Sequence, residues 1–309
     1  MRRKGFVDQS MGSFGKALTW IGAGAVAAVA ALAGTGGVIL CENALHPGRR
    51  SVAPRSGLET VTMRPPGGPR LVAWFLRPAA GNGGCVMILH GIGDTRAAAL
   101  GLAPMFLEKG YAVLLPASRG HGESGGDTVS YGVIEKWDAI EWTRWLRAAG
   151  CRDIFGLGES MGAAILLQAA AERPAFRAVV AECPFASLRW VAEDRIVQRL
   201  WGPPALGRIV ARILVTGGFW YARLRYHLDL DAAAPVRSVE RLHTPVLLIE
   251  GLRDNNVSPA HARAIAASGR SVTLWLVPGA GHTGAAAADP EGFKRRVLGW
   301  FQAAAGAAP

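Results

Sequence analysis

Short apolar runs alternate with segments of helical periodicity along most of this chain. Continuous apolar runs of five or six residues are typical of strands covered on both faces of a sheet. They occur at 85–89, 111–116, 153–158, 178–182, 245–249 and 272–277. Helical spacing follows at 96–109 and 133–149, after Ser160, and at 259–268. This alternation predicts an α/β fold with a mostly parallel, doubly wound sheet flanked by helices. Two earlier runs, 59–63 and 71–76, are separated by Pro65-Pro66-Gly67-Gly68 and predict a hairpin.

The N-terminal pattern is different. Ala17–Leu40 contains no charged residue and follows a basic stretch over 1–16. A helix of that length would span about 36 Å, enough to cross a bilayer. We therefore predict a transmembrane helix over 17–41, with membrane lipid as its partner; a cleaved signal peptide and a buried soluble helix are the alternatives. Residues 42–57 contain Pro47, Gly48 and Pro54 and are expected to form an irregular tether before the domain at 58–305.

Charge and cysteine content add limited information. The net charge is +11, but the arginines are scattered and no nucleic-acid recognition motif is present, so no nucleic-acid partner is expected. Basic residues precede the predicted span, and Arg49, Arg50 and Arg55 follow it, so the balance leans only slightly towards an extracytoplasmic domain. Among the four cysteines no C-x-x-C pair occurs, which favours buried free thiols and leaves the redox compartment open.

One motif lies where a strand turns into a helix. Gly158-Glu159-Ser160-Met161-Gly162 follows an apolar run and precedes a helix-favouring run. Such a G-x-S-x-G turn holds a serine in a strained conformation with its hydroxyl clear of the sheet. A second match at 122–126 lies in a polar, glycine-rich segment and is interpreted as a loop. Ser160 is therefore the candidate nucleophile.

A serine nucleophile requires a base, a carboxylate and a site for the oxyanion. Asp254 follows the penultimate predicted strand, and His282 lies in a glycine-rich loop after the last one, which gives the chain order Ser, Asp, His. Other histidines lie in the tether, in predicted loops or helices, or in or beside the insertion described below, and Asp289 is interpreted as a helix cap. The amides of Met161 and of Ile92, in the turn His90–Asp94, are the predicted oxyanion donors.

Together these residues resemble the α/β-hydrolase superfamily, and most of all its monoglyceride-lipase and serine-aminopeptidase-like branch. The matching segments are the turn at 90–93, Arg119–Gly125 and the serine turn, in the expected order over residues 58–305. Ala117 departs from the acidic residue that this branch often has before its RGHG segment. The resemblance also implies that the aromatic, arginine-rich insertion at about 185–240 forms a helical cap over the active site.

The sequence therefore predicts a membrane-anchored serine hydrolase with an acyl-enzyme on Ser160. Its expected substrates are small molecules with ester or thioester bonds and an apolar acyl group. No metal or organic cofactor is expected. The alternatives are a serine peptidase of the same fold and a non-catalytic, membrane-tethered binding protein.

Overall fold

The computed structural model describes residues 20, 24, 27–53 and 55–306. Within them, eight strands form one sheet in the order β1-β2-β4-β3-β5-β6-β7-β8. The strands are β1 (Glu59–Met63), β2 (Leu71–Leu76), β3 (Gly84–Leu89), β4 (Ala112–Pro116), β5 (Asp153–Glu159), β6 (Ala178–Glu182), β7 (Val246–Gly251) and β8 (Val272–Val277). β1 and β2 form the predicted hairpin, β2 is antiparallel to β4, and the remaining pairs are parallel. The predicted fold class is confirmed.

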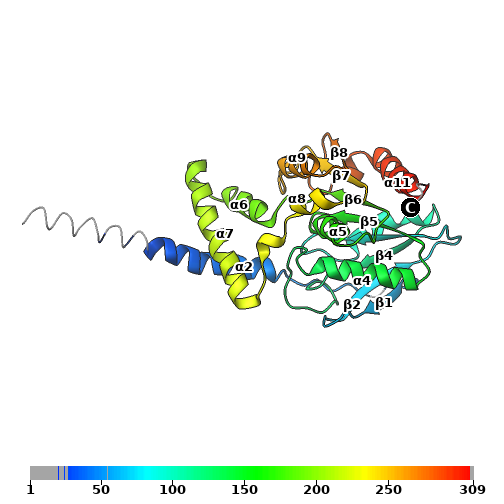
Figure 1. Ribbon diagram of the computed structural model, residues 1–309, viewed down its shortest axis with the longest axis horizontal. Coiled ribbons are helices and arrows are strands. Elements are labelled where there is room, and N and C mark those ends of the chain that lie inside the picture. Colours follow the sequence, from blue (N-terminus) through cyan, green and yellow to red (C-terminus); the bar gives the residue numbers. More distant parts are fainter. Residues whose placement is uncertain (1–19, 21–23, 25–26, 54, 307–309) are drawn as a thin grey trace, which may run out of the picture.

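Helices cover both faces of this sheet (Figure 1). The α-helices of the domain are α3 (Ala103–Leu107), α4 (Glu135–Ala148), α5 (Met161–Glu172), α9 (Pro259–Ser268), α10 (Ala285–Ala288) and α11 (Pro290–Gly306). One buried cluster includes Trp142 of α4 and Ile165 of α5, and a second includes Phe106 of α3 and Phe301 of α11. The helix predicted over 96–109 is shorter, with a 3₁₀ turn η2 (Ala98–Leu102) before α3. Pro104 occupies the first turn of α3, where its missing N–H costs nothing.

The insertion between β6 and β7 is helical. It contains α6 (Leu188–Val197), α7 (Pro204–Tyr226), η3 (Leu230–Ala232), α8 (Pro235–Ser238) and η4 (Val239–Arg241). Phe185, Leu188 and Val191 join Ala222 of α7 and Cys41 in a third buried cluster. The cap core therefore includes residues from the N-terminal segment, which sequence periodicity did not anticipate.

The N-terminal helix extends further than expected. Residues 27–45 are helical, with a π-helical turn η1 (Leu32–Gly36) followed by α2 (Gly37–Leu45), and are long and apolar enough to cross a membrane by length and composition. The helix continues past the predicted end of the span at 41, and its last residue, Leu45, is fully buried. The basic stretch 1–16 and residues 17–19, 21–23 and 25–26 of the predicted span lie outside the described residues.

The tether is irregular from His46 onward, but it is bound to the domain. Arg49 donates a hydrogen bond to the carbonyl of Ser124 at 2.8 Å, and Arg50 Nε donates to the carbonyl of Gly93 at 3.0 Å. The amide of Val52 donates to Glu123 at 2.8 Å. Residues 49–52 thus link the N-terminal helix to the loops at 93 and 123–124.

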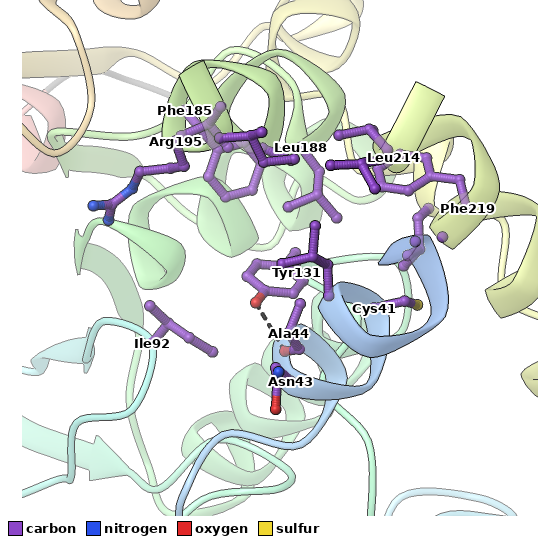
Figure 2. Close-up of a pocket in the computed structure, with 18 of the residues that line it drawn as sticks. Cys41, Asn43, Ala44, Ile92, Tyr131, Phe185, Leu188, Arg195, Leu214 and Phe219 are labelled. Carbon is purple, nitrogen blue, oxygen red and sulfur yellow. Dashed lines mark hydrogen bonds between the residues drawn. The ribbon is translucent and has the colours of Figure 1, made fainter. Parts of the chain in front are cut away.

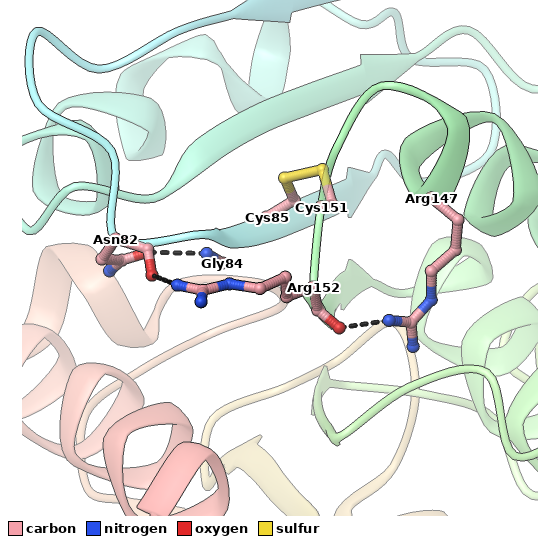
Figure 3. Close-up of a disulfide and its surroundings, with 6 residues drawn as sticks. All are labelled: Asn82, Gly84, Cys85, Arg147, Cys151 and Arg152. Atoms are coloured by element: carbon pink, nitrogen blue, oxygen red, sulfur yellow. Dashed lines mark hydrogen bonds between the residues drawn. A yellow bond between two sulfur atoms is a disulfide. The ribbon is translucent and has the colours of Figure 1, made fainter.

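The cysteines include one disulfide, which corrects the expectation of free thiols. Cys85 at the start of β3 is bonded to Cys151 just before β5 (Figure 3). The two residues are 66 positions apart in sequence, but β3 and β5 are adjacent in the sheet, which brings their first residues together. Cys41 and Cys183 are free and buried, as predicted.

Candidate active site

Ser160 lies at the turn from β5 into α5. It has φ of 52°, a left-handed conformation that side chains rarely adopt. A Cβ at Gly158 would lie 2.5 Å from the amide nitrogen of Ala163, and one at Gly162 would lie 2.2 Å from the carbonyl oxygen of Leu89. Both glycines are therefore required because helix and strand approach so closely. The turn places the hydroxyl at the N-terminus of α5, where the helix dipole favours negative charge.

The three residues selected from sequence lie in one hydrogen-bonded line. His282 Nε2 lies 2.9 Å from Ser160 Oγ, and His282 Nδ1 lies 2.7 Å from Asp254 Oδ2. This network places the histidine proton on Nδ1, where it is donated to the carboxylate, and leaves Nε2 to accept from the serine hydroxyl. The arrangement can move the hydroxyl proton onto the imidazole during nucleophilic attack.

Asp254 is held as an ionised, fixed acceptor. Its side chain is fully buried, and Oδ1 accepts hydrogen bonds from the amides of Asn256 at 2.7 Å and Val257 at 2.9 Å. Burial alone would raise the pKa of this carboxyl group, but the hydrogen bonds from His282 and from the two amides outweigh it and keep the pKa below its usual value. A negative charge at this point stabilises the imidazolium that attack would create.

Two residues that sequence reasoning missed hold the His282 loop. Cys183 Sγ accepts a hydrogen bond from the amide of Thr283 at 3.4 Å, and Glu182 Oε1 accepts from the amide of Ala285 at 2.9 Å. Glu182 is the last residue of β6 and Cys183 follows it, so their position at a strand end was the available signal. Burial raises the pKa of Glu182 to about 7.

Glu250, at the end of β7, is a third buried group near the site that the sequence did not suggest. Its side chain has no exposed surface. Burial, together with the charge of Asp254, raises the pKa of Glu250 to about 9, so this carboxyl group is neutral at pH 7. A neutral neighbour leaves Asp254 as the charged partner of His282.

His90 and His121 fix the turn that carries Ile92. His121 Nε2 accepts from the amide of Gly93 at 3.0 Å, and His90 Nε2 accepts from the amide of Ser118 at 3.1 Å. The rings contact each other edge to face, and burial lowers the pKa of His90 to about 4. Neutral rings therefore hold the loop in place. Ile92 and Met161 both line the pocket beside Ser160, where their amides were predicted to bind an oxyanion.

The competing residues lie elsewhere or have structural partners. Ser124, in the second G-x-S-x-G match, is buried and donates to the carbonyl of Ala117 at 2.7 Å. His261 accepts from the amide of Ala186 at 3.1 Å and lies beside Asp194. Asp289 accepts from the amide of Gly292 at 2.9 Å in the first turn of α11, as its interpretation as a cap predicted. His46, His227 and His243 lie in the tether, at the end of α7 and before β7.

Ser160 lines a pocket of about 400 Å³. The pocket lies between the cap and the N-terminal helix, and Figure 2 shows Leu188 and Leu214 of the cap across from Cys41 and Ala44 of that helix. Its wall is largely apolar and includes Phe185, Leu188 and Leu214. Tyr131 lies against the N-terminal helix and donates a hydrogen bond to the carbonyl of Ala44 at 2.8 Å. An apolar pocket that leads to the candidate nucleophile can hold an apolar group.

One group of side chains has the spacing of a metal site. Ligand atoms of Cys183, Asp254 and His282 lie within 4.8 Å of one another. In the described arrangement Asp254 and His282 bond to each other, and burial raises the pKa of the Cys183 thiol. A metal ion would have to displace both the histidine–carboxylate bond and the thiol proton, so these residues fit proton transfer better than metal binding.

Comparisons with known proteins agree with this fold. Residues 86–296 match the alpha/beta hydrolase family. An uncharacterised protein of Mycobacterium tuberculosis, Rv2307c, is 30% identical over 257 residues, which cover 82% of this chain and 79% of the relative. The solved structure of the esterase Pf2001 of Pyrococcus furiosus has a TM-score of 0.66 at 21% identity and covers 83% of this chain and 98% of its own. Est1E from Butyrivibrio proteoclasticus has a TM-score of 0.57 at 18% identity, covering 80% of this chain and 100% of its own.

One assignment follows from the sheet order, the strained serine turn and the match to the family over residues 86–296. This chain is a hydrolase that belongs to the alpha/beta hydrolase family.

Proposed function

We propose that the protein is a serine hydrolase that cleaves ester or thioester bonds of apolar acyl substrates through an acyl-enzyme on Ser160. The observation that carries this proposal is the line of contacts from Ser160 Oγ to His282, 2.9 Å, and from His282 to Asp254, 2.7 Å, at the end of an apolar pocket. The similarity of fold to proteins named esterases supports the reaction class.

In this mechanism His282 removes the hydroxyl proton as Ser160 attacks the carbonyl carbon. The negative charge that develops on the carbonyl oxygen is stabilised by the amides of Met161 and Ile92. The imidazolium then protonates the departing alcohol or thiol, and a water molecule activated by the same imidazole releases the acid. Alcohols and thiols are better leaving groups than amines, which favours an esterase over the alternative of a serine peptidase.

Labelling with a fluorophosphonate probe tests the nucleophile. Wild-type protein should label, Ser160→Ala should not, and His282→Ala should label at least about a hundredfold more slowly because the base is lost. Ser124→Ala is the matched control, because it changes the second G-x-S-x-G serine, and its labelling should match that of wild type. Equal labelling of Ser160→Ala and wild type would refute the assignment and favour a non-catalytic binding protein.

We also propose that the N-terminal helix anchors the domain on the extracytoplasmic side of a membrane. The apolar helix over 27–45 supports the anchor, and the disulfide between Cys85 and Cys151 supports the side, because such bonds persist in oxidising compartments. The protein should remain in the membrane pellet after a carbonate wash. Its recovery in the soluble fraction would contradict the anchor.

A further inference from the structure

The N-terminal helix forms part of the pocket wall, which is a role beyond membrane anchoring. Gly37, Leu40, Cys41 and Ala44 lie along one side of the pocket, and Leu214 of α7 lies along another. Figure 2 shows Cys41 and Ala44 of this helix facing the same space as Leu188 and Leu214 of the cap. The same segment that is long and apolar enough to cross a bilayer therefore forms part of the wall of the substrate pocket.

The N-terminal helix and α7 are in backbone contact. A Cβ added at Gly37 would lie 2.6 Å from the amide nitrogen of Gly218, and one at Gly217 would lie 2.0 Å from the carbonyl oxygen of Ala33. Contacts this close fix the position of α7 relative to the candidate span. Figure 1 shows the N-terminal helix leading away from the hydrolase domain along the long axis of the molecule, while α7 crosses it steeply. If the part of the predicted span that precedes Ala33 lies in the bilayer, α7 runs close to the plane of the membrane surface.

The outer side of α7 has the composition that this position requires. Leu206, Ile209, Trp220 and Leu224 are between 55% and 72% exposed. At about 100° per residue, these four fall within an arc of about 60°. The buried residues of α7, which include Leu214, Val215 and Gly218, fall on the opposite side. A soluble domain rarely exposes such a stripe without a partner.

The positive charges beside this apolar stripe indicate an anionic membrane surface as its partner. Arg208, Arg212 and Arg223 are exposed along one flank of α7. Arg212 lies 3.9 Å from Glu193 and Arg223 lies 2.9 Å from Asp229, and the whole chain carries a net charge of +11. Trp201, just before the helix, is fully exposed. A helix with an apolar stripe, arginines at its edge and tryptophans is the type that lies in the headgroup region of an anionic membrane. The adjoining N-terminal helix would hold it there.

We propose that α7 lies on the membrane surface and that the pocket receives the acyl chain of a membrane lipid along the wall formed by the N-terminal helix. The proposal rests on the proposed ester hydrolysis. It defines the substrate more narrowly, as an ester whose acyl chain is held in the bilayer and whose carbonyl group reaches Ser160. The largely apolar lining of this pocket, which has a volume of about 400 Å³, suits an acyl chain.

The first test measures the position of α7 and does not depend on activity. Full-length protein is reconstituted in vesicles of phosphatidylcholine and phosphatidylglycerol, with a fluorophore on Leu224→Cys or, as a control, on Trp137→Cys of α4. Both positions are exposed, whereas Cys41 and Cys183 are buried and the other two cysteines are bonded. Lipids with a quencher in the acyl chain should reduce emission at 224 at least about twofold and leave 137 unchanged. Equal emission with and without quencher at 224 would overturn the proposal.

The second test measures ester hydrolysis by the protein reconstituted in the same vesicles. Trp220→Gln should hydrolyse water-soluble p-nitrophenyl acetate at the wild-type rate, because Trp220 does not line the pocket. Its hydrolysis of 4-methylumbelliferyl palmitate embedded in the vesicles should fall about tenfold, through a higher KM. Trp137→Gln is the matched control and should change neither rate.

The outcomes distinguish the proposal of ester hydrolysis from the proposal of a membrane-lipid substrate. Wild-type hydrolysis of acetate but not of embedded palmitate, or equal palmitate rates for Trp220→Gln and Trp137→Gln, would overturn the membrane-lipid proposal and leave ester hydrolysis intact. Failure to hydrolyse either ester would refute the proposed function and, with it, the lipid substrate.

Discussion

Gly162→Ala is expected to damage the candidate site while leaving the fold in place. The new Cβ would lie 2.2 Å from the carbonyl oxygen of Leu89 and 2.8 Å from that of His90, whereas ordinary contacts of this kind begin near 3.4 Å. Relieving the closer contact requires α5 and the end of β3 to separate by about 1 Å. Ser160 immediately precedes α5, and the turn that carries Ile92 follows β3. The separation therefore moves the nucleophile away from a predicted oxyanion donor.

The expected effect on the reaction follows from that displacement. A misplacement of about 1 Å at reacting groups reduces the rate about a hundredfold, equivalent to about 2.7 kcal/mol in the activation barrier. Overpacking should lower the free energy of unfolding by about 1–3 kcal/mol, which a large α/β domain tolerates. The assay is p-nitrophenyl acetate hydrolysis together with the rate of fluorophosphonate labelling, measured on protein whose folding is verified by thermal unfolding.

Gly299→Ala provides the matched control. Gly299 lies in the interior of α11, and a Cβ there would have no neighbour within 4 Å. Alanine is the better helix former, so this variant should keep wild-type activity and gain about 0.5–1 kcal/mol in stability. A folded Gly162→Ala protein that keeps activity within about twofold of wild type would show that the close approach of α5 to β3 does not position the site.

Two further predictions concern stability. Replacing Cys85 and Cys151 by alanine should lower the free energy of unfolding by about 4 kcal/mol, because the bond closes a span of 66 residues, and a reductant should shift the Tm of wild type alone. An unchanged Tm in reductant would contradict the bond. Glu250→Gln should raise the free energy of unfolding by about 3 kcal/mol at pH 7. With a pKa raised to about 9, the contribution of Glu250 to the stability of wild type is fully present below pH 4.5 and is lost as the pH rises towards 9. Urea unfolding from pH 5 to 9 would test this; parallel curves for the two proteins would refute it.

Local sequence was sufficient for the elements of the sheet and for the site residues in it. Each predicted strand was found within about two residues, because buried parallel strands give short, continuous apolar runs bounded by polar or glycine-containing turns. The serine turn was recognisable because backbone contacts leave no room for a Cβ at Gly158 or Gly162, and these are the two glycines of the G-x-S-x-G motif. Asp254 and His282 followed from strand order alone.

Other features could not be predicted because they depend on residues that are distant in sequence. Cys85 lies within an apolar run and Cys151 just before one, and neither position indicates their pairing. The pairing arises because β5 lies next to β3 and not next to β4. The role of Cys183 and Glu182 in holding the His282 loop depends on where that loop returns to the sheet. The raised pKa of Glu250 could not be predicted, because in the sequence Glu250 is only one carboxylate near the end of a strand.

The sequence by itself determined the alternating α/β architecture, the strained serine turn and the strand ends that carry Asp254 and His282, since each depends on contacts between residues close in the chain or on the fixed order of strands. Only the tertiary structure decided that the N-terminal helix continues to Leu45 and forms a wall of the pocket. The physical reason is that Gly37 and Gly218 permit two backbones to touch although 181 positions (218 minus 37) separate them, and hydrophobic periodicity along a chain contains no information about which helices meet.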